Sequence, residues 1–298
     1  MMQLAASYVF FCAFYSILAL SAAVLIRCGV LSLAHSAMAA VGAYASISIW
    51  LYSNSAPVVP GLGSVVLGFI AAFLAGAVVA IVLGILVVRI EGDAVLVATL
   101  LFVEACRRLI EMSDHLGGSV GVAVRSLPDI DASTRSWLIG AVACAGLLFL
   151  VSAFLYLCRS GVGSILDTIR HNAEIAEAAG FNVRKIRYVL FVVCGIVAAM
   201  AGSLYALFTQ YVAPSAFGWD SAILIFVMAL VGEKKSAWGA ILGGCVLYIV
   251  PQFLRLPDWR IPLGLNSLNA ISVAEVWPLI YAVIIMGMAR AQPQARHE

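Results

Sequence analysis

The sequence predicts an all-α fold, a polytopic transmembrane bundle of about 8–10 helices. Composition is the first reason, because 64% of the 298 residues are hydrophobic and only 11% are charged. Ordinary soluble domains carry about 25% charged residues. Apolar runs of about 20 residues, the length that a helix needs to cross a bilayer, recur along the chain. Basic residues stand at the ends of these runs, as expected for helices oriented in a membrane.

The same composition indicates a single transmembrane domain over residues 1–298, because no stretch is polar enough to form a second, soluble domain. A net charge of +2, without a basic run, argues against a nucleic-acid partner and for the lipid bilayer. The seven cysteines are scattered and form no CxxC pair, so we expect small buried hydrophobic side chains and no metal site. The first apolar run lacks a basic flank and is expected to be a retained helix.

Six runs are long enough to span the hydrocarbon layer. They cover residues 4–26, 31–51, 62–88, 137–157, 188–208 and 237–253. Three further runs, at 94–106, 221–231 and 276–289, are short or contain a charge or a proline. Broken segments occur in a bilayer where protein or a water-filled cavity covers their backbone, so these three are candidates for a pathway or an interface. Alternatively, they are longer or tilted helices that continue beyond a charged residue.

The distribution of the 17 Lys and Arg residues predicts the orientation. If all nine runs cross, most of these residues fall on one side, which should be cytoplasmic. The N-terminus is then outside and the C-terminus is cytoplasmic, with the chain in a bacterial inner membrane. A re-entrant segment at 221–231 would change the threading of everything after it.

The longest cytoplasmic connection, residues 159–187, is the most informative stretch. Ser164 followed by Asp167 resembles a capping box, and Gly180 is a natural helix stop about fifteen residues later. Asn172 is a second possible cap, so two short helices at an angle are also possible. This amphipathic segment either needs a partner at the membrane face or only connects two spans.

The connection resembles the cytoplasmic loop of permeases in the branched-chain amino acid ABC transporter family. That loop has the form S-x-x-G-R-x-L-R-A-I-R-E-N-E, followed by an Ala-rich turn and A-x-x-x-G-I-N. The matching positions are Ser160, Gly163, Leu166, Ile169, Arg170, Asn172, Glu174, Ala179, Gly180 and Asn182.

The resemblance extends over residues 29–253. GVLSLAHSA at 29–37, with VGAY at 41–44, is similar to the family's G-x-x-S-L-G-H-x-A-F…G-A-Y segment. DAVLVATLL at 93–101 with Glu104 resembles its y-F-A-I-x-T-L…E stretch. AGSLY at 201–205 and APSAF at 213–217 resemble its A-G-x-L-Y…V-S-P-x-x-F segment.

Several positions depart from the family pattern. The G-R pair is Gly163-Ser164 here, the next Arg is Asp167, and R-E is Arg170-His171. The glycine-rich turn reads GEKKSAWG at 232–239 and carries three charges. These departures predict a divergent member with a correspondingly different ATPase.

The resemblance implies a type II ABC-importer-like permease subunit for branched-chain or other small amino acids, with urea or short amides as relatives. It implies P-loop ATPase subunits, a second permease subunit, identical or homologous, and a periplasmic substrate-binding protein as partners. The connection at 159–187 would be the coupling loop on which the ATPase docks. Its candidate coupling residues are Asp167, Arg170, Asn172, Glu174, Glu177, Ala179 and Gly180.

A second set of residues forms a candidate translocation pathway: Ser32, His35, Gly42, Thr99 and Glu104. Ionisable groups inside membrane segments tend to be functional. Alternatively, His35 beside two serines is a satisfied structural residue, Gly42 serves helix packing, and Glu104 forms an ion pair with an arginine three or four residues later.

Catalytic motifs are missing from the sequence. It contains no HExxH, no GxSxG and no G-x-x-x-x-G-K-[ST], so we expect no catalytic residue, no cofactor and no ATPase site of its own. The alternative function is a secondary transporter or channel for a small solute. Such a protein usually places polar residues at mid-membrane to bind a coupling ion, whereas the mid-span residues here are almost all apolar.

Overall fold

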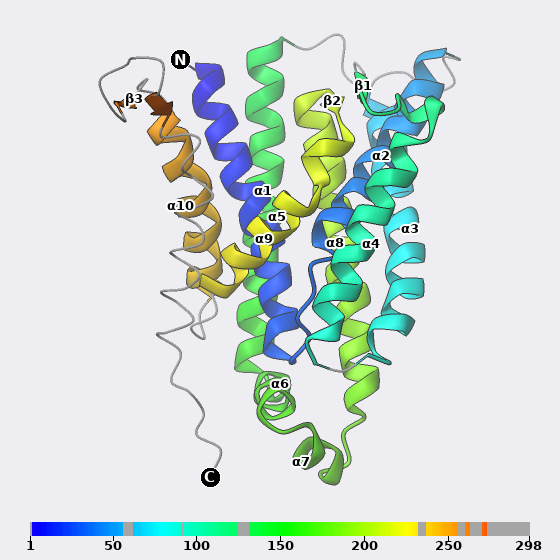
Figure 1. Cartoon of the computed structure of the whole chain (residues 1–298), viewed down its shortest axis with the longest axis vertical. Coiled ribbons are helices and arrows are strands. Elements are labelled where there is room, and N and C mark those ends of the chain that lie inside the picture. The colour runs from blue at the N-terminus through cyan, green and yellow to red at the C-terminus, as the bar shows by residue number, and fades with distance from the viewer. Residues whose placement is uncertain are drawn as a thin grey trace. The chain divides into compact units, whose positions relative to one another are not determined.

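The computed structural model describes residues 2–55, 62–90, 92–123, 131–231, 237–255, 260–262 and 270–272 (Figure 1). The chain forms two compact units, Met1–Gly244 and Cys245–Glu298. The boundary lies inside the last described helix, α10 (Ala237–Arg255). The expectation of one transmembrane domain stays a prediction.

The first unit is a helical bundle. Its long helices are α1 (Met2–Arg27), α2 (His35–Ser55), α3 (Leu62–Val87), α4 (Ala94–Glu111), α5 (Ala132–Arg159) and α8 (Val183–Thr209). Two short helices, α6 (Gly161–His171) and α7 (Ala173–Ala178), lie at one end of this bundle (Figure 1). The 13-residue helix α9 (Trp219–Val231) completes the unit together with the start of α10.

Length and apolarity mark five segments of the described chain as able to cross a membrane. They are Gln3–Arg27, Gly63–Val87, Ser133–Arg159, Val183–Thr209 and Pro214–Val231. Only a minority of the residues in the α3 and α5 segments are buried, whereas most of those in α1 and α8 are buried. Exposed apolar helix surface of this extent fits lipid contact. The predicted all-α membrane bundle is confirmed.

The centre of the unit is the interface of α2 with α8. Gly42 in α2 lies so close to α8 that a Cβ atom there would be 1.9 Å from the Ala199 carbonyl oxygen. A Cβ atom at Gly202 in α8 would likewise lie 1.9 Å from the Ala39 carbonyl oxygen. Small residues allow two helix backbones to approach closely, which is the usual way that membrane helices pack.

Helix α4 is longer than the run at 94–106 that hydropathy marks. It continues through Arg107 and Arg108 to Glu111. The charges do not end the helix because they pair along it: both arginines contact Glu104 and Glu111 at i,i+3 and i,i+4 spacing. The alternative of a helix that continues beyond its charges is therefore correct, and so is the predicted ion pair of Glu104.

Helix α2 begins four residues later than the predicted run at 31–51. Residues 30–33 have no regular secondary structure, and the first helical residue is His35. In Figure 1 this stretch leaves α1 at the end of the bundle where α6 lies and extends past α4 before α2 starts. We name residues 28–34 the link segment. It is mostly buried, as non-helical backbone within a membrane bundle has to be.

The opposite end of the first unit carries short irregular elements. The 3₁₀ helix η1 (Asp114–Leu116) is followed by β1 (Val122–Ala123), which pairs antiparallel with β2 (Tyr211–Val212). The 3₁₀ helix η2 (Pro214–Phe217) precedes α9. These elements join the chain after α4 to the chain after α8.

The second unit contains the end of α10, with Pro251 inside the helix. It also contains the antiparallel strands β3 (Arg260–Pro262) and β4 (Ala270–Ser272). Three parts of the prediction lie outside the described residues. They are the run at 276–289, the C-terminus, and residues 232–236 of the turn that differs from the family's glycine-rich pattern.

Candidate functional site

Helices α6 and α7, with the residues around them, form a helical hairpin between α5 and α8. We call residues 160–182 the α6–α7 element. Ile169, Ala176 and Val183 form its small buried core, one residue from each of α6, α7 and α8. Leu166 on α6 is buried in the main core of the first unit. Apolar residues at helical spacing therefore fasten one face of the element to the bundle.

Asn172 separates the two helices. Its Oδ1 accepts hydrogen bonds from the backbone N–H groups of Glu174 at 2.9 Å and Ile175 at 3.2 Å, as a helix N-cap does. Gly180 follows α7 with φ of +89°, a left-handed conformation that glycine adopts without steric cost. The alternative of two short helices is correct, and so is the stop at Gly180.

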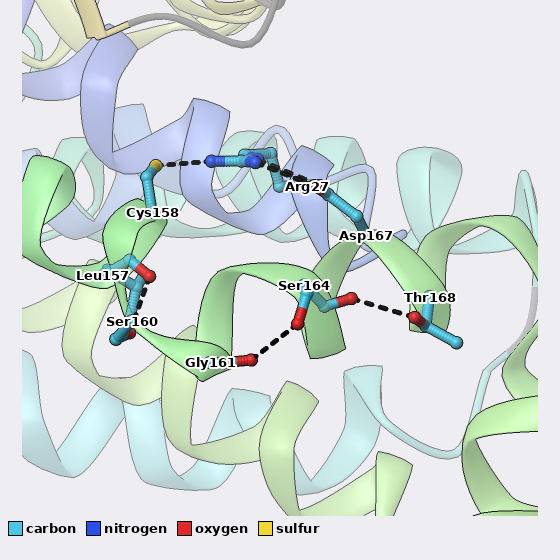
Figure 2. A network of polar contacts seen from close by, with 8 residues as sticks. All are labelled: Arg27, Leu157, Cys158, Ser160, Gly161, Ser164, Asp167 and Thr168. Carbon is cyan, nitrogen blue, oxygen red and sulfur yellow. Dashed lines mark hydrogen bonds and ion pairs between the residues drawn. The ribbon is translucent and has the colours of Figure 1, made fainter.

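The capping box predicted at Ser164 and Asp167 is wrong. Helix α6 starts at Gly161, with Ser160 at the N-cap position. Ser164 lies within the helix, where its hydroxyl donates to the Gly161 carbonyl at 3.0 Å (Figure 2). The sequence pattern misleads because the carboxylate that would complete the box is engaged elsewhere.

Asp167 points toward the bundle and pairs with Arg27, the last residue of α1. The Arg27 Nη2 atom lies 3.0 Å from both carboxylate oxygens, and Nε lies 3.2 Å from Oδ1 (Figure 2). The Arg27 guanidinium also donates to Cys158 Sγ and lies 5.7 Å from the centre of the Phe154 ring. The Arg27 side chain is 11% exposed and that of Asp167 is 39% exposed. This charge-assisted pair, with two N–H groups on the carboxylate, joins α6 to α1.

A second polar contact lies at the turn after α1. Arg187 in α8 donates through Nε to the Cys28 carbonyl at 3.1 Å. Gly29, with φ of +76°, lies directly beneath α6: a Cβ atom there would be 3.7 Å from Arg170 Cα and 3.3 Å from Arg187 Nη2. The turn is therefore packed between the α6–α7 element and the start of α8.

The opposite side of the element faces away from the bundle. Ile175 is 59% exposed and Phe181 is 40% exposed. The carboxylates of Glu174 and Glu177, on α7, are exposed beside them. Apolar side chains that remain exposed among charges, at the tip of a projecting element, are typical of a protein-binding surface.

Of the predicted pathway residues, the structure brings Ser32, His35 and Thr99 into one neighbourhood around the start of α2. Thr99 Oγ1 accepts from the Leu33 N–H at 3.0 Å, and Ser32 Oγ accepts from the Ala34 N–H at 3.2 Å. Because the link segment is not helical, these N–H groups have no helical carbonyl partner, and the two hydroxyl groups accept their hydrogen bonds instead. Glu104 lies in the charge cluster further along α4, and Gly42 in the α2–α8 interface.

His35 is buried and unusual. Among the described residues, neither ring nitrogen of His35 has a hydrogen-bond partner, and neither has the buried Ser36 hydroxyl. The imidazole borders a small cavity with room for about one water molecule, between α1 and α8. The bordering residues besides His35 are Leu25, Ala34, Met38, Phe191 and Gly195. Both interpretations of His35, a pathway residue and a structural residue, therefore stay predictions.

Arg27 and Arg187 are absent from the predicted site. At the sequence level both resemble the basic residues that merely flank spans. The available signal was Asp167, because a carboxylate that replaces a family arginine implies a changed partner for that position.

Comparison with known proteins decides the family. The sequence pattern of the family described as "Branched-chain amino acid transport system / permease component" matches residues 4–289. The chain belongs to this family. The predicted resemblance is thereby confirmed, and the chain is a multi-pass permease component.

Individual relatives are similar at modest identity. The chain is 28% identical over 241 residues to the probable branched-chain amino acid transport permease LivM of Methanocaldococcus jannaschii, covering 78% of this chain and 67% of the relative. It is 25% identical to the high-affinity branched-chain amino acid permease LivM of Escherichia coli, over 76% of this chain and 58% of the relative. The ribose import permease RbsC of E. coli is 23% identical over 52% of this chain and 44% of the relative. No solved structure matches the chain.

Proposed function

We propose that this chain is a transmembrane permease subunit of an ATP-driven importer in the bacterial inner membrane, with the α6–α7 element as its ATPase-coupling site. The observation that carries the proposal is the exposed outer side of that element. The ATPase would dock there, and ATP binding and hydrolysis would shift the bundle between outward- and inward-facing populations. The chain would have no ATPase site of its own.

The substrate class that we propose is branched-chain or other small amino acids, with urea or short amides as the next candidates. The names of the LivM relatives support amino acids. A small polar solute also suits the start of α2, where the buried polar side chains of Ser32, His35, Ser36 and Thr99 lie among apolar residues.

The proposed assembly has two permease chains, two P-loop ATPase subunits and one periplasmic binding protein. The orientation follows the basic residues, with the α6–α7 element and the C-terminus in the cytoplasm. The binding protein would contact the opposite end of the first unit, where Val120 is 74% exposed, Tyr211 is 46% exposed and Trp219 is 55% exposed.

Two variants of the element test the proposal. Glu174→Arg reverses a charge on the exposed side of α7, and Gly180→Trp places a large side chain at a left-handed residue. We expect both to abolish co-purification of the proposed P-loop ATPase partner, and with it ATP-dependent uptake of leucine into proteoliposomes.

The matched controls are Glu174→Gln, which keeps the shape, and Gly180→Asn, since asparagine also adopts the left-handed conformation. Both should retain the ATPase. Normal uptake by both disruptive variants would refute docking on this element. Competition of leucine uptake by unlabelled urea or ribose tests the substrate class separately.

A further inference from the structure

We propose that Arg27 and Arg187 form a two-point clamp through which the α6–α7 element moves the link segment and the start of α2. The clamp consists of the Arg27–Asp167 ion pair and the Arg187–Cys28 hydrogen bond. Both arginines are positioning residues that transmit motion and do not touch the substrate. The inference rests on the proposed coupling function and names the route that motion takes into the bundle.

The first point of the clamp is suited to carrying force. Asp167 is bound by two nitrogens of one guanidinium, an arrangement that fixes direction as well as distance. The Arg27 side chain is mostly buried and is held from the α5 side by Cys158 and Phe154. Because the Arg27 side chain is only 11% exposed, the pair is screened less than a pair of fully exposed side chains. When α6 moves, Arg27 has to follow, and Arg27 is the residue directly before the link segment.

The second point holds the same turn from α8. Arg187 binds the Cys28 carbonyl, and Gly29 fits between the backbone of α6 and the Arg187 guanidinium. The turn therefore contacts α6 on one side and α8 on the other. A change in the distance between these two helices must deform the turn or displace it.

The link segment is able to move because no helical hydrogen-bond ladder holds it. Its first residues, 28–30, bond back to the carbonyls of Leu25 and Ile26. Beyond that turn, the described bonds of its backbone N–H groups are Leu33–Thr99 and Ala34–Ser32, and the second lies within the segment itself. Just beyond its far end, His35 and Ser36 are buried without a partner among the described residues, and a cavity adjoins the imidazole. Unpaired buried polar groups are costly. A displacement that gives them partners would be a second stable position, which is what a two-state element requires.

The test uses the full complex, with the ATPase and the binding protein, in proteoliposomes. In the double variant Arg27→Leu with Asp167→Ala, the ion pair is removed and no unpaired charge is left in the bundle. We expect this variant to retain the ATPase and to hydrolyse ATP, while leucine uptake per ATP falls about tenfold. Hydrogen exchange over residues 28–34, which we expect to respond to nucleotide in the wild type, should no longer respond.

Arg187→Ala should uncouple in the same way, and the exchanged pair Arg27→Asp with Asp167→Arg should regain coupling. Arg89→Ala is the matched control, since Arg89 is an exposed arginine just after α3, and it should behave like the wild type. If the double variant does not accumulate, Asp167→Ala alone, at the more exposed partner of the pair, is judged by the same readouts.

Any one of three results would overturn the clamp. The first is wild-type uptake per ATP in the ion-pair variants, and the second is continued loss of coupling in the charge-exchanged variant. The third is hydrogen exchange at residues 28–34 of the wild type that does not change when nucleotide is added. Failure of the proposed function would look different. In that case the wild-type chain itself would neither bind the ATPase nor import leucine on ATP addition.

Discussion

Helix α8 takes part in two regions that are built in opposite ways. Along its middle it packs against α2 through glycine and alanine, with backbone atoms at the distance of closest approach. At its start it joins the α6–α7 element through a few apolar residues and the turn after α1 through one hydrogen bond, and one ion pair joins α6 to α1 beside it. The first region leaves no room for change, whereas the second can be rearranged by breaking a small number of polar contacts.

This difference suggests a division of labour. Close-packed interiors transmit strain and tolerate little change in volume. Polar contacts are directional and individually modest. A permease driven by a separate ATPase, as proposed above, would need both a rigid interface that keeps the bundle intact and a loosely attached region that can move. The following changes test that contrast.

The largest effect is expected from Gly202→Ala. Its new methyl carbon would meet the Ala39 carbonyl oxygen at 1.9 Å, and two backbones would have to separate. We expect a loss of stability of at least about 3 kcal/mol, seen as loss of monodisperse protein in detergent. Gly146→Ala in α5 is the control, because the nearest atom to its Cβ lies 3.9 Å away. That exchange should be neutral or stabilising by up to about 1 kcal/mol.

The next largest effect is expected from Gly29→Ala, which strains a residue at φ of +76° and presses on Arg187 Nη2 at 3.3 Å. The left-handed conformation costs a non-glycine residue about 1–2 kcal/mol. If the turn carries motion, uptake per ATP should fall while the thermal midpoint decreases by only a few degrees. Gly29→Asn should cost less. A fall in the thermal midpoint as large as that of Gly202→Ala would place this turn in the rigid region.

A smaller, local effect is expected from Asn172→Ala. The substitution removes the side-chain cap of α7 and should cost about 1 kcal/mol. Because α7 is only a short helix, hydrogen exchange at residues 173–178 should rise, and affinity for the ATPase should decrease. Asn172→Asp keeps an oxygen at the cap and should preserve both. Unchanged exchange in the alanine variant would show that apolar packing alone orders α7.

The smallest effect is expected from Glu104→Gln, which lies outside both regions. Glu104 binds Arg107 and Arg108, and Glu111 is available to both arginines as a second partner. Folding and leucine uptake should therefore stay close to the wild type. A loss of uptake without a loss of protein would instead support the prediction that Glu104 lies on the translocation pathway.

Much of the fold could be predicted because it follows from patterns within single helices. Apolar runs located the spans, and Asn172 and Gly180 marked the break and the end of the α6–α7 hairpin. Hydropathy alone predicted too short a helix for α4, because it ends the apolar run at the first arginine. The i,i+3 and i,i+4 spacing of the charged residues allows ion pairs, with which the helix continues. The late start of α2 could not be found in this way, because Ser32 and Thr99, which bind the backbone of the link segment, lie 67 positions apart.

The candidate site, too, could be predicted only in part. All seven coupling residues lie on the α6–α7 element, as the motif resemblance implied, although their roles stay predictions. The partner of Asp167 could not be foreseen, since Arg27 precedes it by 140 positions and looks like any basic residue at a membrane boundary. A capping box depends on hydrogen bonds between residues close in sequence, whereas the Asp167 carboxylate forms an ion pair with a residue far away in sequence.

The link segment also has a consequence for biosynthesis. Its stabilising partners are made after it: Thr99 is 66 residues downstream of Leu33, and Arg187 is 159 residues downstream of Cys28. While the ribosome is still completing the intervening helices, the backbone groups of residues 28–34 have neither contact. The nascent chain should therefore hold this stretch near the aqueous boundary, or as extra turns of α2, and seat it in the bundle only after α8 has been inserted.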